Sequence, residues 1–540
     1  MYLISRCFLT VALAGMCAPT VAQTRAPVMA AGPEAQPAAI DPARLAAFDA
    51  YVDAVRKQFD VPGIAVAIVQ DGKVVMEKGY GLRNIDDGKP VDAHTMFAIA
   101  SNTKAFTAAS LQMLAEDGKL DMNDRVIDHL PWFRMSDPYI TNDMRIRDLL
   151  AHRSGLSLGA GDLLYWPTSS YTTREVAERL RNVPITGQFR AQYAYDNILF
   201  AVAQLVIEDA SGMPYKQFLQ TRFFTPLGMT ETRYNSDDLH PGDNVASGHA
   251  KFNFKELKTV GTTTWRNASG AGGVYSSVHD LTKWMNAQLA GGQIPGSDKR
   301  LFNEKSQRQM WSVLTPIPVG KPSVPELQPA VPNFSGYGEG WFLSDYAGNR
   351  LVWHTGGWPG MVSRVTLVPD RKLGVVVLTN QEVGAAFNAV TYKALDILLG
   401  RADYDWLGAY AKAVAKASGD SDDSWKQHLA ARDAKSKPSL PLPGYAGTFR
   451  DPWYGDVVVR QGAKGLEMRF AKTAELVGDM EPWQHDTFVV HWRERVLNAD
   501  AFVSYALDAD GKVREVRMQP VSPLTDFSFD FQDLRLTPAK

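Results

Sequence analysis

Cysteine is almost absent from this chain: its 540 residues include two, Cys7 and Cys17. Both lie near the N-terminus, so the rest of the chain cannot form disulfides, offer a thiol nucleophile or build a thiolate metal site. An excess of one charge is also lacking, since 57 Lys and Arg residues are balanced by 59 Asp and Glu, a formal net charge of −2. The chain therefore has no basic excess that would favour nucleic-acid binding, and no charge run that would favour a membrane surface.

The apolar run CFLTVALAGMCA near the N-terminus is too short to span a bilayer, which needs about 20 residues. It follows Arg6 and precedes small residues at Thr20 and Ala22, an order typical of a secretory signal peptide. We therefore expect residues 1–22 to be cleaved, leaving a periplasmic or secreted protein with no stable membrane span. The alternative is a retained anchor.

The remaining chain divides into four parts by pattern. Residues 23–40, rich in Pro and Ala, predict a disordered spacer. Residues 41–401 predict the main folded domain, and residues 402–440 predict a helical or linker segment with turn-forming breakers. Residues 441–540 consist of short strand-like runs separated by turns, so we expect a small antiparallel β domain that contributes no catalytic group.

Within the main domain, a helical block interrupts a sheet. GIAVAIVQDGKVVMEKGYG contains two β-rich runs joined at Asp71-Gly72, a strong hairpin signal. From about residue 95 the apolar spacing becomes helical, and strand-like runs return in residues 340–380. A helical run, AFNAVTYKALDILLG, then closes the unit.

The segment FAIASNTKAF places Ser101 three residues before Lys104, and no other serine in the chain has a lysine at this spacing. The pattern after Ser101 is helical, so both side chains lie on one face of a helix start. The helix N-terminus and burial among apolar neighbours both disfavour a charged lysine and lower its pKa. A neutral amine beside a hydroxyl is a base beside a nucleophile. The alternative is a helix-capping serine and an exposed lysine.

A second motif, QYAYDNILF, contains Tyr195 and Asn197 at the start of another helical run. A phenol near Ser101 and Lys104 could relay protons, and an amide could hold a substrate carbonyl and the lysine head. The alternative is a packed tyrosine and a helix-capping asparagine.

A third motif, LVWHTGGWPGM, follows a strand-like run and contains His354, Thr355, Gly356 and Gly357. Adjacent glycines let a substrate approach the backbone closely. A backbone N–H here could form an oxyanion hole together with the N–H of Ser101. The alternative is a plain turn between strands.

Taken in this order, the three motifs resemble those of the penicillin-recognising serine hydrolases. This group includes class C β-lactamases, DD-carboxypeptidases and esterases, and is also called the S12 peptidase family. LLAHRSGL, GAGGVYSSVHDLTKWM and GYGEGW resemble its connecting segments, and the resemblance covers roughly residues 40 to 400. It implies an α/β (α+β) fold: an antiparallel sheet flanked by helices, with a helical subdomain and a cleft between them. The C-terminal part resembles the lipocalin-like, β-barrel-like domain of unknown function that often follows.

The resemblance also implies residue roles. Ser101 would be the acylated nucleophile, and Lys104 and Tyr195 would share proton transfer, either of them being the base. Asn197 would orient the substrate and Lys104, while His354 and Thr355 would bind the polar end of the substrate. The residues implied for substrate binding and the oxyanion hole are Asn197, His354, Thr355, Gly356 and Gly357.

The expected function is a secreted or periplasmic serine hydrolase that acts through an acyl-enzyme on a small amide or ester. His354 replaces the lysine of the Lys-Thr-Gly element, so we expect peptidase- or esterase-like activity with weak β-lactamase activity. The alternative is a catalytically degenerate penicillin-binding or ligand-binding protein. We expect no cofactor or metal, a small-molecule or peptide substrate as partner, no nucleic acid, and a homo-oligomer as one option.

A competing motif is Gly155-Leu156-Ser157-Leu158-Gly159, which matches the Gly-x-Ser-x-Gly nucleophile elbow. An elbow needs a strand before the serine and a helix after it. Here helical spacing precedes Ser157, and glycines and a proline follow it. We therefore interpret this segment as a glycine-rich loop.

Overall fold

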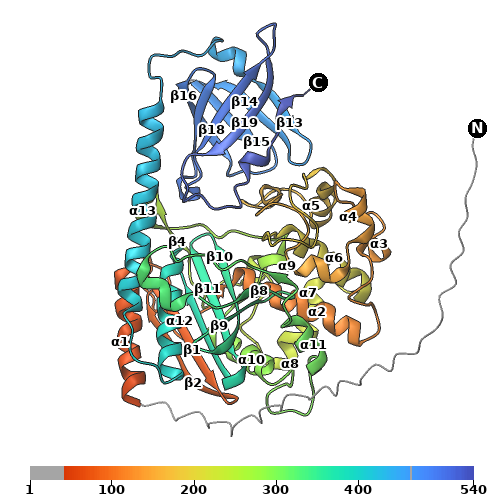
Figure 1. Cartoon of the computed structure of the whole chain (residues 1–540), viewed down its shortest axis with the longest axis vertical. Helices are drawn as coiled ribbons and strands as arrows, with labels where there is room; N and C mark the ends of the chain where they lie inside the picture. The colour runs from red at the N-terminus through yellow and green to blue at the C-terminus, as the bar shows by residue number, and fades with distance from the viewer. Residues whose placement is uncertain (1–41, 463–464, 540) are drawn as a thin grey trace, which may run out of the picture. The chain divides into compact units, whose positions relative to one another are not determined.

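The computed structural model describes residues 42–462 and 465–539, which Figure 1 colours by position in the chain. The signal peptide and spacer expected in residues 1–40 lie outside the described residues. None of the helices in the described ranges combines the length and the apolar composition needed to cross a membrane.

An eight-stranded sheet forms the centre of the main domain, in the order β2-β1-β12-β11-β10-β9-β8-β7. Every neighbouring pair runs antiparallel, which confirms the expected antiparallel sheet. The strands are β1 (Gly63–Gln70), β2 (Lys73–Gly81), β7 (Thr315–Pro316), β8 (Ser335–Tyr337), β9 (Phe342–Tyr346), β10 (Asn349–Trp358), β11 (Met361–Val368) and β12 (Leu373–Thr379).

Strand β1 is apolar along its whole length because both faces of the sheet are covered. Ile64, Val66 and Ile68 pack against α1 (Pro42–Gln58) and α12 (Gly384–Leu398) on one face. The alternate residues Ala65, Ala67 and Val69 belong to the other core, with α2 (Lys104–Glu116) and α10 (Val278–Leu289). Each fully buried Val or Ile contributes about 1.5–3 kcal/mol of transfer free energy.

The hairpin expected at Asp71-Gly72 joins β1 to β2 and is confirmed. Both turn residues have positive φ, +49° at Asp71 and +79° at Gly72. This is the backbone that a two-residue hairpin turn requires, and Asp-Gly is among the pairs that adopt it most readily.

The helical block is also confirmed, and it separates β2 from the later strands in sequence (Figure 1). Within it, α2 is buried from Lys104 to Leu114 and therefore runs through the core rather than over the surface. The other helices between β2 and β7 are α3 (Val126–His129), α4 (Pro138–Asp143), α5 (Thr173–Arg179), α6 (Ile198–Ser211), α7 (Tyr215–Leu219), α8 (Thr225–Leu227), α9 (Ser269–Gly272), α10 and α11 (Glu304–Met310). Two short strand pairs complete this region: β3 (Phe97–Ala98) with β6 (Tyr275–Ser276), and β4 (His249–Phe252) with β5 (Glu256–Thr259).

The segment expected as a helix or linker contains one long helix, α13 (Trp406–Ala431). The run ASGDSDDS, which was expected to break structure, lies inside this helix with mostly exposed side chains. Solvent-facing Ser and Asp cost a helix little, and local pairs such as Lys416 with Asp420 add support. The Asp405 side chain caps the N-terminus by accepting from the Gly408 N–H.

The C-terminal region confirms the expected small antiparallel β-barrel-like domain. Its strand order is β19-β18-β17-β16-β15-β14-β13-β20, and a bridge between Val516 and Leu536 nearly closes the barrel. A turn that contains Asp510 and Gly511 joins β18 to β19. The strands are β13 (Gly447–Asp451), β14 (Gly455–Gly462), β15 (Gly465–Phe470), β16 (Val477–Gln484), β17 (Thr487–Trp492), β18 (Ala501–Leu507), β19 (Val513–Pro520) and β20 (Thr537–Pro538).

Candidate active site

Ser101 lies in a single 3₁₀ turn, Ala100–Thr103, that leads directly into α2. Ala100 has a φ of +47°, a conformation that costs a non-glycine residue about 1–2 kcal/mol. The preceding carbonyl, that of Ile99, accepts a hydrogen bond from Ser363 Oγ at 2.8 Å. An added Cβ at Gly356 would approach the same carbonyl oxygen to 2.2 Å, so only glycine lets β10 pass this close to the turn.

The ammonium end of Lys104 is enclosed by protein, and the residue is 0% exposed. Its Nζ lies 2.9 Å from Ser101 Oγ, 2.7 Å from Asn197 Oδ1 and 2.8 Å from the Ala271 carbonyl oxygen. Burial lowers the pKa of Lys104 to about 7, against the opposing charges of Asp162 and Asp196.

These three contacts fix what a neutral Lys104 amine can do. The amide oxygen of Asn197 and the carbonyl oxygen of Ala271 only accept hydrogen bonds, so they take both N–H groups of the amine. Its lone pair is then directed at Ser101 Oγ, which can donate its proton. The sequence expected a base beside a nucleophile, and the structure brings the two atoms to hydrogen-bond distance.

Tyr195 covers the same amine, with Lys104 Nζ 5.0 Å from its ring centroid. Burial raises the pKa of Tyr195 well above its usual value, although a hydrogen bond with Ser101 opposes the shift. The phenol is therefore protonated at neutral pH and is suited to relay a proton rather than to remove one. Of the two candidate bases, Lys104 has the pKa that fits this role.

Asn197 links Lys104 to a buried carboxylate that the sequence motifs did not single out. Its Oδ1 accepts from Lys104, while its Nδ2 donates to Asp162 Oδ2 at 2.9 Å, which fixes the orientation of the amide. Asp162 also accepts from the hydroxyls of Tyr165 and Ser528. Burial raises the pKa of Asp162 to about 7, and these hydrogen bonds work against that shift.

Residues of the C-terminal domain reach this second layer of the site. Ser528 Oγ donates to Asp162 Oδ2 at 2.8 Å, and Asp530 accepts from the backbone N–H groups of Gly161 and Leu163. The Phe527 ring packs edge-on to that of Tyr195, with centroids 6.0 Å apart. The domain was expected to contribute no catalytic group. These contacts make it a positioning element, which the sequence did not indicate.

His354 lies on β10, and both of its ring nitrogens have protein partners. Nδ1 is 2.6 Å from the Thr355 carbonyl oxygen and Nε2 is 2.8 Å from Tyr337 Oη. A carbonyl only accepts, so Nδ1 carries the proton and Nε2 accepts from the tyrosine. Burial, helped by the charge of Lys104, lowers the pKa of His354 well below its ordinary value. The ring is therefore neutral, and a direct bond to a substrate would require giving up one of these partners.

The remaining predicted residues lie along the same strand edge. Strand β9 pairs with β10 only as far as Trp353, so the edge of residues 354–358 on that side has no strand partner in the described part of the chain. This part of β10 runs beside the Ser101 turn. At Gly357 an added Cβ would have no neighbour within 4 Å, so the residue faces open space.

The competing elbow motif has the wrong structural context. Ser157 lies in a loop, with short 3₁₀ turns at Ile146–Leu150 and Asp162–Leu164 before and after it instead of a strand and a helix. Its Oγ donates to Asp533 Oδ2 at 3.2 Å, and no lysine amine or imidazole is hydrogen-bonded to it among the described residues. Across the described residues, no group of three or more His, Cys, Asp or Glu side chains is placed to hold a metal ion.

Comparison with known sequences finds a matching family model for each of the two domains. Residues 48–399 match the family model described as Beta-lactamase, and residues 431–538 match a domain of unknown function, DUF3471. An unguisins hydrolase of Aspergillus violaceofuscus is 29% identical over 446 residues, covering 76% of this chain and 75% of the relative. Protein flp of Staphylococcus aureus is 25% identical over 320 residues, covering 59% and 60%.

Solved structures share the fold. The octameric penicillin-binding protein homologue from Pyrococcus abyssi superposes with a TM-score of 0.59 at 19% identity, covering 91% of this chain and 99% of the other. SurE superposes with a TM-score of 0.53 at 20% identity, covering 92% and 99%.

We expect Ser101 to be the residue that reacts with a fluorophosphonate probe. Intact-mass analysis and peptide mapping of the labelled protein should find one adduct, on Ser101. Ser101→Ala should abolish labelling because no other described serine has an amine directed at its hydroxyl. Ser157→Ala is the matched control and should keep most of the labelling rate; an adduct on Ser157 would reverse this assignment.

The labelling rate should depend on the protonation of Lys104. The lone pair that accepts the Ser101 proton exists only when the amine is neutral, so the rate should rise as pH increases through about 7 and then level off. Lys104→Arg keeps a cation and removes the base, and should slow labelling by about 10²–10⁴-fold. A rate that keeps rising toward pH 10 would mean that Lys104 has an ordinary pKa.

Ser528→Ala, a substitution in the C-terminal domain, should alter the protonation of the active site in the main domain. Loss of this hydrogen bond raises the pKa of Asp162, so less negative charge opposes the burial of Lys104 and the pKa of Lys104 falls. The acid limb of the pH profile of the labelling rate should move to lower pH. The maximal rate should fall several-fold, because the free energy of one hydrogen bond corresponds to a rate change of that size. Ser504→Ala, on β18 of the same domain, should leave both unchanged. An unchanged profile in Ser528→Ala would remove the positioning role.

Proposed function

The chain belongs to the beta-lactamase family, and from that premise we propose that it is a serine hydrolase that acts through an acyl-enzyme. The observation that carries the proposal is the contact between the Lys104 amine and Ser101 Oγ at 2.9 Å, in a buried setting that lowers the pKa of the amine to about 7, so that about half of it is neutral at pH 7. The first described relative is named a hydrolase, which agrees with this assignment.

In the acylation step, Lys104 Nζ takes the hydroxyl proton of Ser101 while Oγ bonds to the carbonyl carbon of the substrate. The electron pair of the carbonyl moves to its oxygen, which the N–H groups of Ser101 and Gly357 would hold. The bond to the leaving group then breaks, and the leaving group receives the proton from Lys104 through the Tyr195 hydroxyl. Water then attacks the acyl carbon and gives a proton to Lys104. The bond from this carbon to Ser101 Oγ breaks, Oγ takes the proton back from Lys104, and the acid is released.

The substrate class follows from the charge of the site. With His354 neutral, the position where a Lys-Thr-Gly element would supply a cation has none, so a substrate carboxylate gains little there. We therefore propose a small amide or ester without an anionic end, peptidase-like or esterase-like, with weak β-lactamase activity.

We expect kcat/KM for a neutral ester or amide to exceed that for a cephalosporin. Because the pKa of His354 is lowered well below its ordinary value, the ring stays neutral from about pH 6 to about pH 8. The ratio of cephalosporin to neutral-ester activity, measured in Glu382→Gln to remove a nearby carboxyl with a pKa of about 7, should therefore stay flat over this range, since the titration of Lys104 affects both substrates equally. His354→Lys should raise the ratio by supplying a cation.

The flat ratio tests the same point with His354 in place, so the conclusion does not depend on how well a lysine folds into a buried position. If the cephalosporin is hydrolysed faster than every ester and amide tried, the proposed substrate class is wrong. A ratio that climbs as pH falls through about 6.5 would show that His354 is charged when substrate binds.

A further inference from the structure

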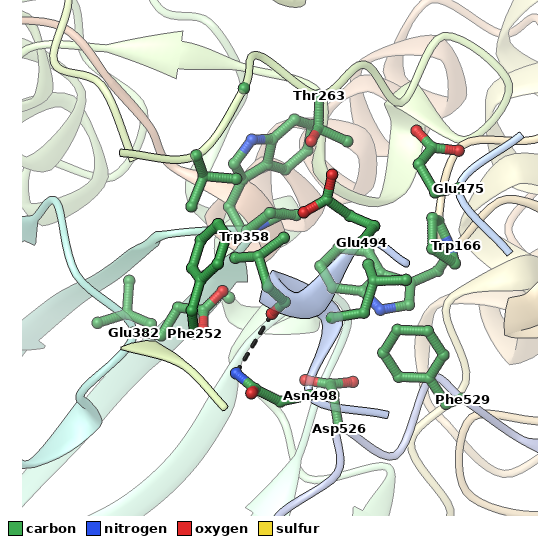
Figure 2. Close-up of a pocket in the computed structure, with 18 of the residues that line it drawn as sticks. Trp166, Phe252, Thr263, Trp358, Glu382, Glu475, Glu494, Asn498, Asp526 and Phe529 are labelled. Atoms are coloured by element: carbon green, nitrogen blue, oxygen red, sulfur yellow. Dashed lines mark hydrogen bonds between the residues drawn. The ribbon is translucent and has the colours of Figure 1, made fainter. Parts of the chain in front are cut away.

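A pocket of about 520 Å³ adjoins the candidate active site, and its lining comes from both domains (Figure 2). Gly357 and Trp358 of β10 contribute to its wall from the catalytic side. On the C-terminal side the wall includes Asp526, the residue before Phe527, whose ring packs on Tyr195. The pocket therefore begins where the proposed oxyanion strand ends, within reach of a substrate held at Ser101.

Four carboxylates line this pocket: Glu382 from the main domain, and Glu475, Glu494 and Asp526 from the C-terminal domain. No Lys, Arg or His lines it, and none of the four makes a salt bridge with any residue that the structure describes. We call it the carboxylate pocket. Glu382, Glu494 and Asp526 are accessible to solvent, and Glu475 is partly so. With no cation among the described lining residues, the carboxylates give the pocket a negative potential that favours a cationic group.

Two polar atoms of residues in the pocket wall have no protein partner in the part of the chain that the structure describes. Oε2 of Glu475 is buried and has no hydrogen-bond partner in the described ranges, and the same is true of Trp166 Nε1, whose ring lines the pocket. Neither atom has accessible surface, so a bound group can pair with them only after the side chains rotate toward the pocket. The pKa of Glu382 is raised to about 7, first by burial and further by the charge of Asp526.

The aromatic side chains narrow the ligand class. Trp166, Phe252, Trp358 and Phe529 stand among the carboxylates, as Figure 2 shows. Aromatic faces together with carboxylates favour an alkylammonium or guanidinium group, which combines a charge with an apolar stem. A bare metal ion does not fit, because no three ligand side chains in the part that the structure describes converge on one point.

We propose that the carboxylate pocket binds a cationic group of the substrate, an ammonium or guanidinium, while the scissile amide or ester lies at Ser101. The inference rests on the proposed hydrolase function and specifies its substrate class. It predicts a preference for amides or esters of basic amino acids, or with a free amino end, over uncharged analogues of equal size.

The test compares substrates that differ by one cation. Lysine and norleucine p-nitroanilides, in D and L forms and with the α-amine free or acetylated, isolate the side-chain and the α-ammonium group in turn. For at least one of these matched pairs, kcat/KM should be about tenfold or more higher for the cationic member. Glu382→Gln and Asp526→Asn should each reduce this ratio, and the double variant should bring it close to one.

The pH dependence of the ratio adds a second readout. A cation binds the ionised form of Glu382, so for lysine against norleucine with the α-amine acetylated the preference should grow as pH rises through about 7 and Glu382 loses its proton. The side-chain ammonium stays charged over this range, whereas a free α-amine loses its own proton at about pH 7.7–8. The other groups facing Glu382 across the pocket, Glu475, Glu494 and Asp526, are acids and change the size of the effect but not its sign. Lys104 titrates in the same range, and its effect cancels in the ratio. Glu481→Gln, which removes an exposed carboxylate of β16 outside the pocket, is the matched control and should leave the ratio unchanged.

The experiment distinguishes a wrong pocket proposal from a wrong hydrolase proposal, because the two give different results. Turnover of both members of every pair at equal kcat/KM overturns the pocket proposal alone. If neither member is hydrolysed, calorimetry of lysinamide and norleucinamide with Ser101→Ala decides the question without catalysis. Tighter binding of lysinamide, lost in the Glu382 and Asp526 double variant, supports the pocket; equal binding overturns it.

Discussion

The enclosure of the Lys104 amine is the constraint on which the rest of the site depends. A primary amine surrounded by protein gives up its proton readily, and its two N–H groups must then find acceptors. The Asn197 amide and the Ala271 carbonyl supply them, which leaves Ser101 as the group that faces the lone pair. The close passage of β10 at Gly356 and the positive φ of Ala100 hold the serine at that distance.

Charge is distributed around this amine in layers. Asp162 and Asp196 oppose the effect of burial and keep the pKa of Lys104 near 7 instead of lower. Ser528, from the other domain, helps to keep Asp162 ionised, so the β-barrel-like domain has a place in the electrostatics of the site. Farther out, His354 is neutral and the pocket beyond Gly357 is lined by carboxylates. Such a surface disfavours an anionic substrate at both ends and accommodates a cationic one.

The sequence predicted the parts of this structure that local patterns determine. The antiparallel sheet, the Asp71-Gly72 hairpin and the barrel-like end follow from alternation, apolar runs and turn residues. The short spacing from Ser101 to Lys104 on a helix start indicated that the two side chains meet. Asp162, Phe527 and Ser528 could not be found this way, because Ser528 and Asp162 are brought together by folding from positions 366 residues apart. Likewise, ASGDSDDS contains turn-forming residues, but a capped, solvent-facing helix accommodates them.

The protonation of Lys104 near neutral pH decides whether this mechanism can operate, since with a pKa of about 7 about half of the amine is neutral at pH 7. It can be measured directly by NMR on protein labelled with ¹³C at the lysine ε-carbon, with Lys104→Arg used to assign the signal. We expect the Lys104 signal to titrate with a midpoint at about pH 7, while exposed lysines titrate near their reference pKa of about 10.4. A Lys104 signal that titrates together with the exposed lysines would contradict the account.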